Sequence, residues 1–211
     1  MALQPSLNFL RQGNGPNSLE IYLDALCPFS AKITRSLSEN VLPLILKGGK
    51  YEGKLNLIAR LYPQPFHYYA VFHTEALIVF GQLYPDLFWD YLTVIFDTQA
   101  EYFNQPSASL TPSEARDKLV HLAVDLLEKK GKSNGPKSKV FGELRDKLEV
   151  KSSPNGGNEA TDGFKYGLKV GRQNGIQVTP TAVFNGLKED AVSSSWGKEE
   201  WEKFLSEKLG A

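Results

Sequence analysis

The segment best suited to chemistry is Cys-Pro-Phe-Ser at residues 27–30, because it holds the only cysteine among 211 residues. An apolar run over residues 19–23 precedes it, and residues 31–37 follow with helical spacing. A cysteine at the start of a helix lies beside free backbone amides and the positive end of the helix dipole, and both stabilise a thiolate. The segment therefore predicts a nucleophilic thiol.

A second unusual feature lies far along the chain, where Val178, Thr179 and Pro180 precede the apolar residues 181–184. Proline cannot donate a hydrogen bond to a sheet ladder, so its place at the start of a strand needs a reason. A cis turn is one such reason. The pair Asn-Gly at residues 185–186 favours a hairpin directly afterwards.

The elements that must position these residues follow from the hydrophobic periodicity. Residues 19–26 and 54–62 are predicted strands, and residues 28–46 form a helix between them that is kinked near Pro43. Two strands joined by a crossover helix lie parallel. Further helices are predicted over residues 73–84, 85–101, 111–130, 138–148, 159–174 and 198–209.

Composition limits the function classes. The 24 lysines and arginines balance the 24 aspartates and glutamates, so no overall charge favours nucleic acid or an anionic membrane as a partner. No apolar run reaches the roughly 20 residues of a membrane span, and the first residues lack a signal-peptide pattern. A lone cysteine favours a reducing compartment. We expect a cytoplasmic protein; the oligomeric state is unknown from the sequence.

The chain resembles the thioredoxin-like fold and, within it, the DsbA-like group. In that group an Asp-x-x-Cys-Pro segment precedes a helix, and a cis Thr-Pro or Val-Pro turn faces the cysteine. Here Asp24, Cys27 and Pro28 match the first motif, and Thr179 and Pro180 match the second. The resemblance covers nearly the whole chain past residue 17.

This resemblance implies an α/β fold, with a central mixed sheet and an inserted helical subdomain. The thioredoxin-like domain then spans residues 19–211. Its core is expected over residues 19–72 and 164–211, with the helical insertion at about 73–163. Residues 1–18 are rich in Gly, Asn, Pro and Gln, and they are predicted to be a flexible N-terminal segment.

The sequence departs from the dithiol members at Ser30, where they carry a second cysteine. A dithiol oxidase needs both thiols, so its cycle cannot run here. The resemblance instead implies a thiol- or glutathione-dependent oxidoreductase or transferase that acts on a small-molecule or thiol substrate. No tightly bound cofactor is expected, and glutathione is the candidate ligand.

Two other function classes stay open. The kappa-class glutathione transferases and the 2-hydroxychromene-2-carboxylate isomerases share the superfamily without dithiol chemistry, and by that analogy Ser30 or Cys27 would hold a glutathione thiolate. A redox-independent isomerase, lyase or cyclase is therefore an alternative. The other is a non-catalytic module that binds a peptide or ligand in the groove beside Pro180.

The predicted site residues fall into three groups. The catalytic candidates are Cys27, Ser30 and His67. His67 is included because the junction after the second strand lies near the active-site rim in DsbA-like folds. The substrate-binding candidates are Pro28, Phe29, Thr179 and Pro180. The acids that alternate on one face of the first strand, Glu20 and Asp24, are candidates for a proton relay.

Each of these residues also has a structural interpretation. Cys27 fits a buried, inert thiol, and Pro180 fits a structural cis-proline. His67 fits a loop histidine bonded to backbone, and Asp24 fits a cap of the helix or turn. A single cysteine with scattered histidines gives little support for a zinc site, so no metal is expected.

Overall fold

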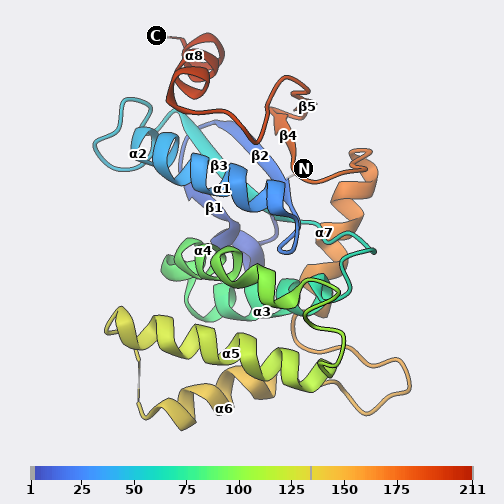
Figure 1. The fold of residues 1–211 in the computed structure, drawn as a ribbon. Helices are drawn as coiled ribbons and strands as arrows, with labels where there is room; N and C mark the ends of the chain where they lie inside the picture. The colour runs from blue at the N-terminus through green and yellow to red at the C-terminus, as the bar shows by residue number, and fades with distance from the viewer. Residues whose placement is uncertain (1–2, 134, 211) are drawn as a thin grey trace.

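A computed structural model describes residues 3–133 and 135–210 and shows a five-stranded mixed sheet with helices around it (Figure 1). The strands lie in the order β1-β3-β2-β4-β5. Only β2 and β3 pair in parallel, as the crossover between them requires, and the other neighbours are antiparallel. The strands are β1 (Arg11–Gly13), β2 (Asn17–Leu23), β3 (Leu55–Leu61), β4 (Thr181–Phe184) and β5 (Leu187–Lys188).

Eight α-helices and three 3-10 helices occur in the described part of the chain. The predicted kink at Pro43 appears as a break between two helices. The α-helices are α1 (Pro28–Asn40), α2 (Leu42–Ile45), α3 (Ala70–Leu83), α4 (Phe88–Thr98), α5 (Pro112–Lys129), α6 (Lys137–Lys147), α7 (Thr161–Gln173) and α8 (Lys198–Leu209). The 3-10 helices are η1 (Pro5–Leu10), η2 (Pro85–Leu87) and η3 (Gln99–Tyr102).

The two faces of the sheet are covered by different helices because side chains alternate along β2. Leu19 and Ile21 belong to the main core, which also contains Trp201 of α8. Tyr22 points to the other face and packs with Val170 of α7. The sheet is thus a middle layer, which fits the apolar sequences of β2 and β3.

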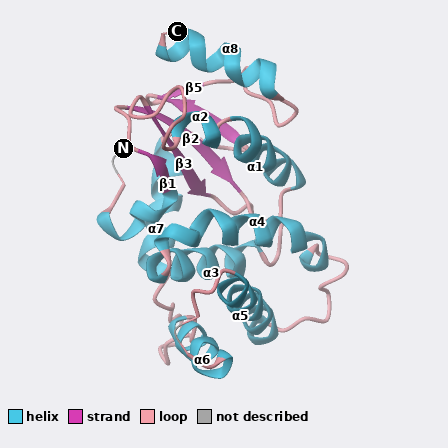
Figure 2. Cartoon of the chain, turned by 90° about the vertical axis from the view of Figure 1, so that its left-hand side faces the viewer, coloured by secondary structure: helices cyan, strands magenta, loops and turns pink. Residues whose placement is uncertain are grey.

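The helices α3 to α6 form the insertion, which lies below the sheet, while α8 lies at the opposite end of the molecule (Figure 2). Helix α3 is the centre of the insertion, and every residue from His73 to Gly81 is buried. A helix buried on all sides must pair its polar groups. The carboxylate of Glu75 does so by accepting two hydrogen bonds from Arg116 of α5, at 3.0 and 2.9 Å.

None of the helices in the described ranges combines the length and the apolarity that a membrane span requires.

The prediction of a flexible segment over residues 1–18 was wrong for its described part; residues 1–2 lie outside the described residues. Helix η1 buries Leu7, Phe9 and Leu10 in the core, and β1 pairs with β3 as an edge strand. The Gly- and Asn-rich composition belongs to the turn between β1 and β2. The apolar residues before it were the signal for an ordered segment.

Candidate functional site

Cys27 lies where strand β2 delivers the chain to helix α1. The strand ends at Leu23, and Cys27 occupies the N-cap position with Pro28 as the first helical residue. Its side chain is only 6% exposed. The thiol is nevertheless in a polar contact, since Sγ donates to the carbonyl oxygen of Thr179 at 3.3 Å. The Thr179–Pro180 peptide bond is cis. The two motifs that lie far apart in the sequence therefore meet at the sulfur.

Asp24 organises the turn in front of the thiol. It is fully buried, and three donors reach its carboxylate. The amide of Leu26 donates to Oδ1 at 2.7 Å, and the amide of Gln64 donates to Oδ2 at 2.6 Å. The third donor is Nδ1 of His67, at 2.8 Å from Oδ2. These bonds replace the water that the carboxylate loses on burial, and they tie the β2–α1 turn to the segment after β3.

Within residues 3–133 and 135–210, His67 is the one titratable side chain bonded to Asp24. A carboxylate only accepts hydrogen bonds, so Nδ1 carries the proton, and in the neutral ring the lone pair lies on Nε2. Nε2 makes no hydrogen bond within the described residues. The side chain is 22% exposed, and the ring lines a cavity of about 250 Å³ together with Leu26 and Pro28. His67 is thus oriented by an acid and open to a cavity beside Cys27.

Ser30 and Gln99 lie behind Cys27. Ser30 is fully buried, and its hydroxyl oxygen accepts a hydrogen bond from the amide of Asp24 at 3.2 Å. The side-chain amide of Gln99 donates to the carbonyl oxygens of Ala25 and Cys27, at 2.9 and 3.5 Å. Ser30 does not line the cavity at His67, so in this structure it supports the turn rather than facing a substrate.

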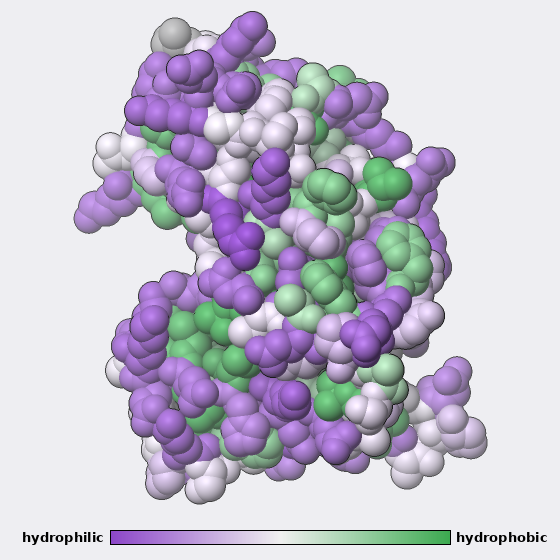
Figure 3. Space-filling view, in the orientation of Figure 1, coloured by the Kyte–Doolittle hydropathy of each residue, from purple (hydrophilic) through white to green (hydrophobic). Residues whose placement is uncertain are grey.

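The rim around the thiol is apolar. Four side chains that would normally be buried stand exposed there: Phe29 (62%), Phe66 (60%), Tyr68 (67%) and Val178 (64%). In the space-filling view, apolar side chains gather in the middle of the right-hand half of this face (Figure 3). Exposed apolar surface grouped in one place is typical of a binding surface.

Asn104 holds the loop that carries His67. Its side-chain amide donates to the carbonyl oxygen of Phe66 at 2.8 Å, and its oxygen accepts from the amide of Tyr68 at 3.1 Å. The ring of Phe66 packs edge-on against His67, with 4.7 Å between centroids. The insertion therefore fixes the position of His67 through η3 and the residues that follow it.

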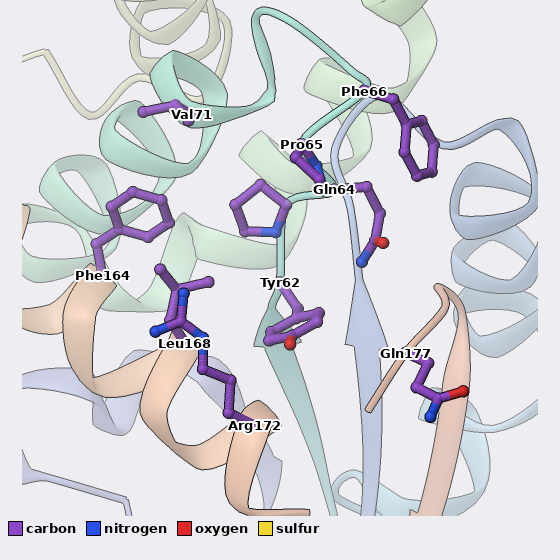
Figure 4. A pocket seen from close by; sticks show the side chains of 10 residues that line it. Tyr62, Gln64, Pro65, Phe66, Val71, Phe164, Leu168, Arg172 and Gln177 are labelled. Carbon is purple, nitrogen blue, oxygen red and sulfur yellow. The ribbon is translucent and has the colours of Figure 1, made fainter. Parts of the chain in front are cut away.

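A larger groove, of about 570 Å³, lies next to this site (Figure 4). One wall is the segment Tyr62–Phe66 after β3, and the other is formed by Phe164, Leu168 and Arg172 of α7. Gln177, two residues before Thr179, also lines it. The groove thus runs from α7 toward the cis-proline turn.

Glu20 is not brought to the thiol. Its carboxylate accepts a hydrogen bond from Nε of Arg60 on β3 at 2.6 Å, and both side chains are buried. Four residues of extended strand, about 13 Å, separate Glu20 from Asp24. The two acids do not form the chain of hydrogen bonds that a proton relay needs. Asp24 instead caps the turn, which is one of the two interpretations that the sequence left open, and its carboxylate also binds His67, which the sequence did not indicate.

The structure gathers most of the predicted residues in one place. Cys27, Pro28, His67, Thr179 and Pro180 lie together, and Phe29 is exposed on the first turn of α1. Sequence analysis missed the residues that act through backbone or side-chain amides: Gln64, Gln99 and Asn104. Nothing in the local pattern marks these amides, because each bonds to a residue at least 36 positions away.

No protein-family model matches the sequence, and no curated protein matches it. Several solved structures, in contrast, match the fold of this chain. A putative protein-disulfide isomerase from Pseudomonas syringae has a TM-score of 0.70 and 21% identity, covering 95% of this chain and 99% of that one. BdbD from Bacillus subtilis has a TM-score of 0.61 and 18% identity, covering 99% and 97%. DsbA from Chlamydia trachomatis has a TM-score of 0.61 and 16% identity, covering 98% and 93%. The expected DsbA-like thioredoxin fold is confirmed.

Proposed function

We propose that this protein, which has a DsbA-like thioredoxin fold, is a single-thiol oxidoreductase whose reactive group is Cys27. One observation carries the proposal: Cys27 occupies the N-cap position of α1, its thiol contacts the cis Thr179–Pro180 turn, and it lies beside a histidine that a buried carboxylate orients. An inert core cysteine needs no such surroundings. Two further structural neighbours, the MdbA proteins from Actinomyces oris and Corynebacterium diphtheriae, are named thiol-disulfide oxidoreductases, which supports the same chemistry.

The reaction that fits one thiol is exchange through a mixed disulfide. Cys27 loses its proton to Nε2 of His67 or to solvent, and its sulfur attacks one sulfur of a small-molecule disulfide. A bond forms between Cys27 and that sulfur, the original S–S bond breaks, and the leaving thiolate takes up a proton. A second small thiol then attacks the mixed disulfide, which releases Cys27 and yields a new disulfide. No net oxidation of the protein occurs.

Glutathione is the proposed small thiol, and the cytoplasm is the proposed location. With Ser30 in the fourth motif position, Cys27 has no resolving partner in the chain, so a thiol from solution must complete the cycle. A reducing compartment supplies such a thiol in excess. We assign Ser30 no contact with the substrate, because its hydroxyl is buried against Asp24.

The test is turnover of a glutathione mixed disulfide, measured by a coupled assay with glutathione and glutathione reductase. We expect catalysis by the wild-type protein and by Ser30→Ala, and none by Cys27→Ser. The rate of mixed-disulfide formation with oxidised glutathione, followed by intact mass, is expected to be higher in the folded protein than in urea. If Cys27 reacts no faster in the folded protein than in the unfolded chain, the proposal is wrong.

A further inference from the structure

We propose that the groove between α7 and the segment Tyr62–Phe66 binds the apolar body of a substrate that carries a carboxylate, and that Arg172 binds this carboxylate. The proposal rests on the proposed function, because it names the class of small molecule whose sulfur is presented to Cys27. That class is an aromatic or aliphatic disulfide or thiol with a carboxylate group.

The size and walls of the groove fit a small molecule. Its volume of about 570 Å³ is within the usual range of ligand sites, roughly 300–1,000 Å³. The lining is mainly apolar and includes Pro63 and Pro65. Phe164 and Leu168 lie on the α7 side of the groove (Figure 4). Such walls stabilise an apolar body by removing it from water, and they leave polar contacts to a few residues at the edges.

The positive charge in the groove favours a ligand that carries a negative group. Arg172 is the only charged residue among those that line it. It lies on an exposed stripe of α7 with Lys165 and Lys169, and no ion pair joins any of the three to a described residue. A guanidinium matches a carboxylate with two parallel hydrogen bonds. An anionic group on the ligand would therefore pair with Arg172 on this wall.

The groove is held in shape by a close approach of α7 to β3. A side-chain carbon at Gly171 would lie 2.2 Å from the ring of Tyr62, and one at Gly167 would lie 3.2 Å from the carbonyl oxygen of Leu61. A Cβ at Gly171 would force the Tyr62 ring to move, and one at Gly167 would be a tight fit. The hydroxyl of Tyr62 in turn donates to the carbonyl oxygen of Ile176 at 3.2 Å. The wall that carries Arg172 is thus fixed before a ligand arrives, which lowers the entropy lost on binding.

The groove leads to the thiol. Gln64 lines the groove, and its backbone amide donates a hydrogen bond to the carboxylate of Asp24. Phe66 lines the groove, and its ring packs edge-on against His67, which lines the neighbouring cavity. Gln177 borders the groove two residues before Thr179, whose carbonyl oxygen accepts from the thiol. A ligand in the groove therefore lies alongside the reacting residues.

Binding is tested first without the thiol. Titration of Cys27→Ser with pyrenebutyrate, a fluorescent apolar carboxylate, is expected to saturate at one molecule per chain. Arg172→Gln in the same background is expected to weaken this binding about tenfold, to the affinity of the uncharged pyrenebutanol. The matched control is Lys132→Gln, which removes an exposed positive charge outside the groove and leaves binding unchanged. Absence of saturable binding, or equal binding by Arg172→Gln, overturns the proposal.

Selectivity is tested next with the thiol present. Two aryl disulfides react with Cys27 by the same exchange: dithiobis(nitrobenzoate), which carries carboxylates, and the uncharged dithiodipyridine. We expect Arg172→Gln to slow the first about tenfold and to leave the second unchanged, whereas Lys132→Gln changes neither. An equal effect on both reagents overturns the role of Arg172. A Cys27 that reacts with neither reagent contradicts the proposed function, while the binding titration still decides the role of the groove.

Discussion

Two of the buried carboxylates, Asp24 and Glu75, are held in opposite ways. Asp24, at the thiol, accepts hydrogen bonds from two backbone amides and from His67. Glu75, inside the insertion, is bonded to Arg116, whose guanidinium also stacks on Phe72 with 4.6 Å to the ring centroid. Arginine keeps its charge at all ordinary pH, whereas histidine exchanges a proton near neutrality. The second pair fixes structure, and the first is suited to proton transfer.

The histidines of the same two regions also differ: His67 is partly exposed, and His73 is fully buried. His67 opens onto a cavity. His73, six residues later, is fully buried, and its Nδ1 donates to the carbonyl oxygen of Tyr69 at 2.8 Å. Burial lowers the pKa of His73 to about 4. A histidine without a charged partner and without solvent stays neutral, so burial and partner decide whether the residue type can do acid-base work.

The largest expected effect is on the free energy of unfolding, and it concerns Glu75 and not Asp24. Arg116→Met leaves Glu75 buried and unpaired, so the free energy of unfolding measured in urea should fall by about 3–5 kcal/mol. Disulfide exchange by the protein that remains folded should not change. The double variant Glu75→Met with Arg116→Met is the control and should recover most of the loss. A matching loss in exchange rate would show that the insertion interior is part of the site.

The second prediction concerns the pH dependence of stability at His73. Between about pH 6.5 and the pKa of about 4, the unfolded chain binds a proton that the folded chain does not. The contribution of this histidine is complete above about pH 6.5 and is lost as the pH falls toward 4, by about 3 kcal/mol. The ring packs edge-on against Tyr102, whose pKa is raised to about 12 mainly by burial, so Tyr102 does not titrate there.

The measurement is urea unfolding of wild type and His73→Gln at a series of pH values. The difference in free energy of unfolding between the two proteins should shrink as the pH is lowered through this window. A difference that stays constant with pH contradicts the assignment of a neutral, buried His73.

Substitution of His67 is expected to change the free energy of unfolding least. It should nevertheless lower the rate of disulfide exchange clearly. In His67→Gln the exchange rate should fall about a hundredfold, which is about 2.7 kcal/mol in the barrier, because only solvent remains of the two proposed acceptors of the thiol proton. Stability should stay within about 1 kcal/mol, since glutamine can still donate to Asp24. The matched control is His121→Gln on α5, an exposed position where neither quantity should change. A rate equal to wild type would reduce His67 to a structural residue.

Local patterns were sufficient for much of the fold. The apolar runs of β2 and β3, the helical pattern over residues 111–130 and the Asn185-Gly186 turn each predicted an element at its observed place. They failed for residues 5–13, where η1 and β1 become ordered only by packing on α3 and pairing with β3. The resemblance to DsbA-like proteins, which rested on two motifs, correctly gave the fold.

The sequence by itself determined that Cys27 cannot form an intramolecular disulfide, because it is the only cysteine among the 211 residues and Ser30 stands in the fourth motif position. The surroundings of that thiol were decided by the tertiary structure. The bond from Cys27 to Thr179 joins residues 152 positions apart, and the bond from His67 to Asp24 joins residues 43 apart. Periodicity and turn residues act over a few positions along the chain, whereas such contacts depend on strand register and on how closely α7 and the insertion pack against the sheet.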